Sequence, residues 1–170
     1  FKPIGLHDES LHQEPDTSSW KVEEFNQLVG KQFKKLEKVI QNPKEIINES
    51  FDYLLSKNFI PTSLTPEKKI IVYSDYRLEI SQAVEPIETS SDHDKFSSML
   101  TELLGPLNQS DKIRTKFKTF NVELNDSELT QGITLLEIVG ENNNEIISIK
   151  STWKCYWEWT EQSKILKLQK

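Results

Sequence analysis

The sequence predicts an α+β domain in which three helices pack on one face of a bent antiparallel sheet. Between residues 18 and 104, three segments carry apolar residues every three or four positions, which is the period of a helix. From residue 113 onward the apolar residues recur at every second position, which is the period of a strand. Helices and long strands thus occupy different parts of the chain, as is typical of an α+β fold.

The composition indicates a single domain with a real core. The chain has 170 residues, 35% of them hydrophobic and 28% charged, with a net charge of −6. We expect no nucleic-acid partner, because phosphate binding depends on clustered Lys and Arg. We also expect no membrane span, because no apolar run approaches the roughly 18 residues that a span needs. Residues 1–17 have no period and predict a flexible arm, which leaves residues 18–170 as the domain.

Three helices are expected before the long strands. The first begins at Ser18 or Ser19, either of which can cap it, and Asn42-Pro43 ends it. Pro43 then opens the second helix, which ends near Lys57. The third begins after Ser91 or Asp92 and stops at Gly105-Pro106. Their apolar positions are, in order, Val22, Phe25, Val29, Phe33, Leu36 and Ile40; Ile47, Phe51, Leu54 and Leu55; and Phe96, Met99, Leu100, Leu103 and Leu104.

The strands are expected to bend. Residues 70–80 predict a short hairpin that turns at Ser74-Asp75. In residues 113–124 the apolar phase changes near Lys118-Thr119, which predicts a β-bulge. The next strand, residues 129–139, shows a similar change at Leu135 and predicts a second bend. A loop at residues 140–144 leads to the strand of residues 146–159, and a short last strand carries Ile165, Leu166 and Leu168.

The strand of residues 146–159 has one strongly apolar face. Trp153, Trp157 and Trp159 alternate along this face with Cys155, the only cysteine of the chain. Cys155 is expected to be a small buried side chain, since the local sequence supplies no basic neighbour that would activate a thiol. The tryptophan face must therefore cover either a solid core or a concavity that could hold a ligand.

The order of elements and four local stretches carry a resemblance. These stretches are GKQFKKLEKVIQNPKEI (30–46), IVYSDYRLEI (71–80), KFKTFNVEL (116–124) and SIKSTWKCYWEW (148–159). The element order resembles the NTF2-like, or SnoaL-like, cone fold. The local stretches are similar to the N-terminal domain of secreted bacterial proteins of the ASPIC/UnbV and FG-GAP repeat group. This likeness covers about residues 18–168 and implies a secreted or periplasmic location, with a neighbouring β-propeller domain as a partner.

NTF2-like domains often have a pocket between the sheet and the helices, and enzymes of this class place an Asp or a His-Asp pair in it. A carboxylate in such a pocket has a raised pKa and can act as a base. The tryptophan face, however, contains no Asp, Glu or His. The remaining candidates are Asp75, His93 and Arg114, whose alternative roles are turn formation, a helix start and an exposed strand position.

The sequence therefore predicts a non-catalytic binding or accessory module of a larger secreted protein, which could hold a small apolar ligand or a partner. The alternative is a small isomerase or dehydratase with an acid or base in the pocket. A homodimer through the polar phase of the tryptophan strand (Lys150, Thr152, Lys154 and Tyr156) is a further possibility. No catalytic residue, metal ligand or cofactor site is assigned. The predicted lining of the ligand pocket is Tyr73, Tyr76, Arg114, Phe117, Trp153 and Trp157.

Overall fold

The computed structural model describes residues 17–84, 93–124, 129–159 and 166–170, and it has the predicted α+β class. The predicted arm, the expected caps of the third helix and Ile165 lie outside the described residues. The elements are α1 (Thr17–Ile40), η1 (Pro43–Asn48), β1 (Lys69–Ser74), β2 (Glu79–Ala83), α2 (His93–Leu104), η2 (Gly105–Leu107), β3 (Lys112–Leu124), β4 (Leu129–Glu141), β5 (Ile146–Trp159) and β6 (Leu166–Leu168).

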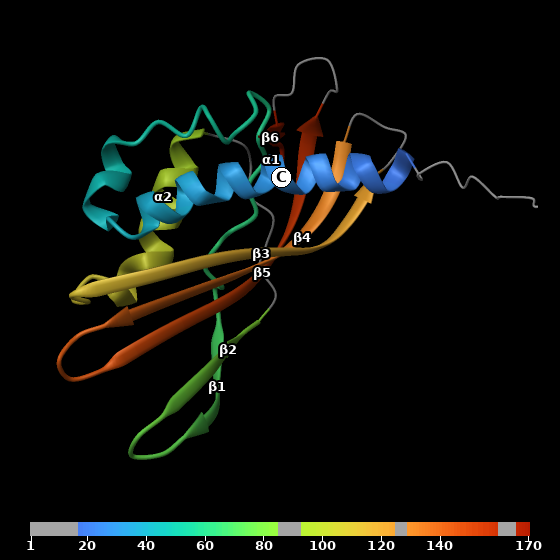
Figure 1. The fold of residues 1–170 in the computed structure, drawn as a ribbon. Helices are drawn as coiled ribbons and strands as arrows, with labels where there is room; N and C mark the ends of the chain where they lie inside the picture. Colours follow the sequence, from blue (N-terminus) through green and yellow to red (C-terminus); the bar gives the residue numbers. More distant parts are fainter. Residues whose placement is uncertain (1–16, 85–92, 125–128, 160–165) are drawn as a thin grey trace, which may run out of the picture.

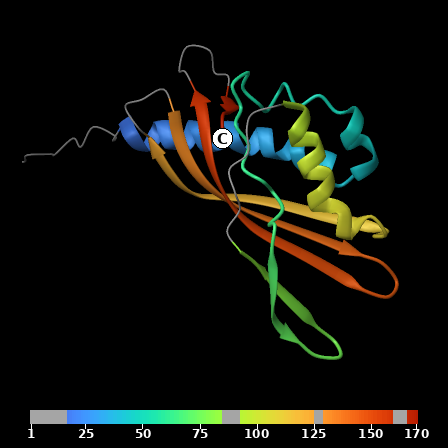
Figure 2. The ribbon, with the colours of Figure 1, turned by 180° about the vertical axis from the view of Figure 1, so that it is seen from behind.

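The architecture has a helical layer on one side of a four-stranded antiparallel sheet. The sheet has the order β3-β4-β5-β6, and a separate two-stranded sheet pairs β1 with β2. Helix α1 crosses the long strands on one side, while the β1–β2 hairpin projects on the other side (Figures 1 and 2). We call the sheet face under α1 the inner face. Within the described residues, no helix is long and apolar enough to cross a membrane.

Helix α1 follows its predicted stripe. Phe25, Val29, Phe33, Leu36 and Ile40 are all buried against the sheet and the other helices. The helix ends at Ile40, just before Asn42-Pro43 as predicted. Its side also reaches strand β3, because the backbone N–H of Phe117 donates to Glu37 Oε1 over 3.0 Å.

The bend in β3 is confirmed. The pairing of β3 with β4 shifts register between Thr119 and Asn121, so Phe120 is the extra residue of a bulge. Phe117 therefore faces α1 before the bulge and Val122 faces inward after it, while Phe120 is 59% exposed.

The predicted change of phase in β4 is wrong, because β4 curves with its neighbours without a bulge (Figure 1). The pairing of β4 with β5 runs from Leu129 to Glu141 without a register shift. Leu136 is completely buried on the inner face, whereas Leu135 lies half-buried on the outer face. Lys118 of β3 pairs with Leu135, and Lys154 of β5 pairs with Ile133. Apolar side chains are tolerated on this outer face because the methylene stems of neighbouring lysines cover them.

The second predicted helix is also wrong over most of its length. Only Pro43–Asn48 is helical, as the 3₁₀ helix η1, and Ile46 is buried in place of Ile47, which is 77% exposed. Beyond it, Ser50 Oγ donates to the Asp52 carboxylate over 2.7 Å, and such local side-chain bonds compete with a helix. The chain then runs beside β6, where the N–H of Leu168 donates to the carbonyl of Leu54. This strand-like pairing requires the backbone to leave the helical conformation.

A glycine of β4 allows the helical layer to approach the sheet closely. A Cβ atom at Gly140 would lie 2.3 Å from Ser110 Oγ and 2.7 Å from Leu107 Cδ2. Leu107 belongs to η2, which follows α2, and it is buried in the core. Gly140 thus fixes the place where the end of the helical layer rests on the sheet.

Candidate functional site

Aromatic side chains occupy the space between α1 and the inner face of the sheet. The rings of Phe33 and Phe117 stack with centroids 4.4 Å apart. Trp157, which is completely buried, meets Phe33 edge-on at 5.4 Å, and Trp153 meets Phe117 at 5.5 Å. The tryptophan face is therefore packed against the helix as a core at this position.

The inner face carries little chemistry among the described residues. Cys155 is buried beside Trp153 and Trp157, and burial raises the pKa of its thiol to about 12. The hydroxyl groups of Thr119 and Thr134 share a hydrogen bond of 2.9 Å, so these two polar side chains have a partner in each other. In the described segments, no group of His, Cys, Asp and Glu is arranged to hold a metal ion.

The six residues predicted to line one pocket lie in three places. Phe117, Trp153 and Trp157 come together under α1. Tyr73 and Tyr76 belong to the projecting hairpin, and Arg114 forms an ion pair with Glu141 on the exposed outer face of the sheet. A single pocket lined by all six is therefore absent from the described residues, and their part in ligand binding stays a prediction.

The candidate catalytic groups are also separated. Asp75 lies at the tip of the hairpin, where its Oδ1 accepts the N–H groups of Arg77 and Leu78 over 2.7 and 2.8 Å. The Tyr73 hydroxyl donates to Oδ2 over 2.7 Å. These bonds, that from Tyr73 first, hold the pKa of Asp75 below its usual value. Asp75 thus has the role of a turn residue. His93 begins α2, and its side chain lies outside the description.

The hairpin carries an apolar surface that has no cover in the described chain. Every residue of β1 and β2 is exposed. Residues directly opposite each other in an antiparallel pair point to the same face, so the pairs Ile70–Gln82 and Tyr73–Ile80 lie together on one face. Leu78 and Val84 continue that face in phase with Ile80. We call it the hairpin face, and its residues are Ile70, Tyr73, Leu78, Ile80 and Val84.

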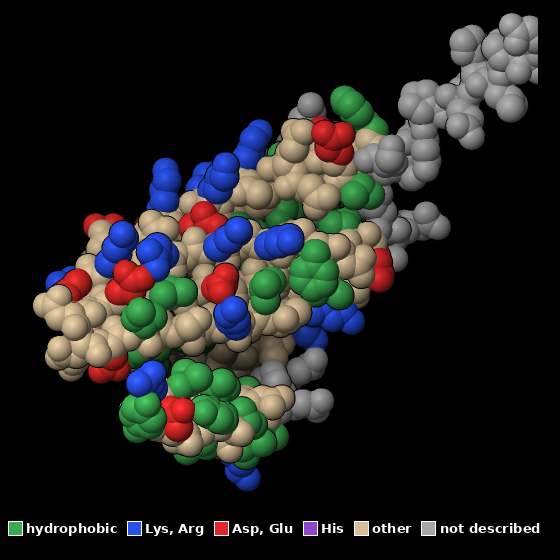
Figure 3. Space-filling view, turned by 60° about the horizontal axis from the view of Figure 1, so that its bottom comes forward, with side chains coloured by type: hydrophobic (Ala, Val, Ile, Leu, Met, Phe, Trp, Pro, Cys, Tyr) green, Lys and Arg blue, Asp and Glu red, His purple; other side chains and the backbone are tan. Residues whose placement is uncertain are grey.

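The hairpin face stands apart from the body of the protein. Its five side chains are 54%, 49%, 51%, 44% and 45% exposed, in chain order. Figure 3 shows hydrophobic side chains gathered on the hairpin at the lower end of the view, with a hollow between them and the rest of the molecule. The opposite face is more polar, with Lys69, Ser74, Glu79 and Ser81 beside Ile71.

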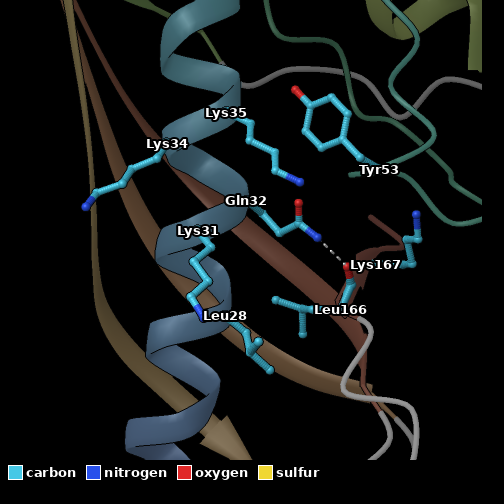
Figure 4. Close-up of a pocket in the computed structure, with 8 residues that line it drawn as sticks. All are labelled: Leu28, Lys31, Gln32, Lys34, Lys35, Tyr53, Leu166 and Lys167. Atoms are coloured by element: carbon cyan, nitrogen blue, oxygen red, sulfur yellow. Dashed lines mark hydrogen bonds between the residues drawn. The ribbon is translucent and has the colours of Figure 1, made fainter.

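A pocket of about 430 Å³ lies on the flank of α1, between the helix, Tyr53 and β6. Gln32 closes its floor by donating from Nε2 to the carbonyl of Leu166 over 3.1 Å (Figure 4). Lys35 points into it, with Nζ 5.2 Å from the centre of the Tyr53 ring. We call this the α1 pocket, and its lining is Leu28, Lys31, Gln32, Lys34, Lys35, Tyr53, Leu166 and Lys167.

Burial and charge set the properties of the α1 pocket. Burial, and secondly the nearby Glu49, raise the pKa of Tyr53 to about 12, so its hydroxyl stays protonated at physiological pH.

Sequence reasoning missed this pocket. The lysines of residues 31–38 have the pattern of a solvated helix face, whereas Tyr53 and Leu166 reach them only through the tertiary fold.

Comparisons with known proteins add little to this picture. No model of a protein family matches the chain, and no curated protein matches it either. Among solved structures, a chain of naphthalene 1,2-dioxygenase with indole bound in its active site is similar, with a TM-score of 0.47 and 14% identity. The match covers 85% of this chain and 72% of the other. This likeness is too distant to support a functional argument, and the NTF2-like and ASPIC/UnbV resemblances stay predictions.

Proposed function

We propose that the chain is a non-catalytic binding module of NTF2-like type, part of a larger secreted protein, which docks onto another folded protein domain through its hairpin face. The observation that carries the proposal is the projection of a hairpin whose apolar side chains are about half exposed. An isolated two-stranded hairpin is marginally stable in water. A partner that covers the hairpin face would bury its apolar side chains and so stabilise the hairpin.

The size of the hairpin face fits a protein contact. Weighted by their exposed fractions, its five side chains present on the order of 500 Å² of apolar surface, within the ~300–600 Å² of functional patches on monomers. A standard interface takes about 800 Å² from each partner. The hairpin face with a polar rim, including Tyr76 at 86% exposure, approaches that area. Tyr73 lies within the hairpin face, and tyrosine is a residue type enriched at the centres of such interfaces.

Charge favours a protein over a membrane as the partner. The hairpin carries Lys69 and Arg77 together with Asp75 and Glu79, so neither sign dominates. Binding to an anionic lipid surface depends on a cluster of basic residues. A mixed rim around an apolar centre is instead the usual anatomy of a protein interface.

The backbone favours docking by the face rather than by the edge of the hairpin. The pairing of β1 with β2 shifts register between Ile71 and Tyr73, which marks a bulge at Val72. A bulge twists an edge away from further strand pairing. The side chains of the hairpin face, which lie on both strands, are then the groups that a partner can cover.

Site-specific photocrosslinking tests the proposal. Benzoylphenylalanine is placed at Ile80 on the hairpin face or at Ile71 on the opposite face, in cells that produce the full protein. We expect position 80 to yield one discrete crosslinked species and position 71 to yield none. The additional substitution Leu78→Lys should abolish the species from position 80. Equal crosslinking from both positions, or none from position 80, would overturn the proposal.

The same experiment separates the possible partners. A crosslinked mass of twice the chain identifies a second copy. A crosslink within one longer polypeptide identifies a neighbouring domain, such as the propeller that the resemblance implies. The packing of Phe33, Phe117 and Trp157 supports the non-catalytic part of the proposal, because these rings fill the space between α1 and the sheet, where the NTF2-like resemblance implies the acid or base of an enzyme.

A further inference from the structure

The α1 pocket has the residues of a second binding site, which does not depend on the hairpin. Leu28, Lys31, Gln32 and Lys35 form one row along α1, since residues three, four and seven apart share a helix face. Tyr53 and Leu166 close the pocket opposite this row. Its volume of about 430 Å³ lies within the range of small-molecule sites, ~300–1,000 Å³.

The lining of the pocket is positively charged, although the protein as a whole is negatively charged. The chain has a net charge of −6, yet among the described residues Lys31, Lys34, Lys35 and Lys167 line the pocket and no acidic side chain does. Two of these ammonium groups are held in place. Lys35 lies over the Tyr53 ring, and Lys167 donates to the backbone carbonyl of Asp52. Oriented positive groups at the mouth of a cleft attract an anion.

We propose that the α1 pocket binds a small organic carboxylate, with its charged group at Lys35 and its apolar part against Leu28. Lys31 lies beside Leu28 at the other end of the pocket and adds to the attraction (Figure 4). Lys34 borders the pocket but points away from Tyr53 and Lys167 in the same view. Lys38 is exposed on the same helix, has the same charge and does not line the pocket, so it is the matched control.

Isothermal titration of the purified chain with octanoate tests this site. We expect Lys35→Ala to weaken octanoate binding by on the order of tenfold, the usual effect of losing a hydrogen bond to a charged group. Lys38→Ala should leave the affinity within about twofold. Octanol and octylammonium should bind much more weakly than octanoate, and high salt should weaken octanoate.

Three results would overturn the proposal. They are no binding of octanoate, equal losses from Lys38→Ala and Lys35→Ala, and binding of octylammonium as tight as that of octanoate. Inorganic phosphate that binds as tightly as octanoate would refute the role given to Leu28. The variant Ile80→Lys distinguishes the α1 pocket from the hairpin face. If octanoate binding disappears in Ile80→Lys, octanoate binds to the hairpin face and the proposal of a site in the α1 pocket is overturned. The proposed docking function is tested by crosslinking and does not depend on this titration.

Discussion

Two glycines should respond to the same substitution with opposite signs. In Gly140→Ala, the new methyl group would lie 2.3 Å from Ser110 Oγ, 2.7 Å from Leu107 Cδ2 and 3.1 Å from Ser110 Cβ. The Ser110 hydroxyl can rotate away, but Leu107 is 1% exposed and cannot move without displacing its core neighbours. We therefore expect a loss of about 1–3 kcal/mol in the free energy of unfolding, the usual cost of overpacking.

The matched control is Gly30→Ala in the middle of α1. No atom lies within 4 Å of a Cβ atom at that position. Alanine restricts the unfolded chain and favours the helix, so this variant should gain about 0.5–1 kcal/mol. For a protein of this size, each 1 kcal/mol corresponds to about 2–4 °C in the melting temperature.

Urea unfolding followed by tryptophan fluorescence measures both changes, since Trp157 is buried in the native state. Equal slopes of free energy against urea in all variants would show that the comparison concerns the same folded and unfolded states. A Gly140→Ala protein as stable as the parent would refute the close approach of η2 to β4. A loss of stability in Gly30→Ala would refute the open surroundings assigned to Gly30.

Three further predictions concern the core, the thiol and the hairpin tip. Trp157→Ala should cost about 3–5 kcal/mol, measured by urea unfolding, whereas a loss under 1 kcal/mol would contradict the aromatic packing. The Cys155 thiol keeps its proton to higher pH in the folded chain than in the unfolded chain. The free energy of unfolding should therefore fall as pH rises from 9.0 toward about 12. Cys155→Val should reduce this fall, and a pH profile of unfolding that is unchanged in this variant would contradict the burial of the thiol. Asp75→Ala removes three bonds at the turn, so the amides of β1 and β2 should exchange hydrogen faster while those of β5 keep their rates; uniform acceleration would instead indicate global destabilisation.

The sequence predicted the elements that pack on one side only. In α1 a single stripe faces the core, so the helical period could be read directly. The residues of this stripe are buried as expected, and they are Phe25, Val29, Phe33, Leu36 and Ile40. The same holds for the bulge of β3, because Phe117 and Val122 both face inward across it. One buried face gives one clear period.

The sequence misled where both faces of an element are covered or where long-range contacts decide. Strand β4 is central, so Leu135 and Leu136 are both partly or fully buried on opposite faces, and two adjacent apolar residues gave the pattern of a bulge that is absent. The chain after η1 leaves the helix to pair with β6, which no local pattern near Leu54 reveals. The α1 pocket likewise joins Gln32 to Leu166, 134 residues apart. The predicted hairpin exists, but its separation from the main sheet is a tertiary property.

The position of β6 constrains the order in which the protein can be assembled during synthesis. Leu168 bridges to Leu55 in parallel and bonds to the backbone of Leu54 and Ser56, so the segment after η1 finds these partners only when β6 has left the ribosome. Phe25 and Phe33 of α1 lack their cover until β3 to β5 have been made, and Leu54 lacks its partner strand until β6 follows. Contacts between such distant residues also slow folding. The nascent chain therefore has a long period of exposed apolar surface, during which a chaperone has the most to protect.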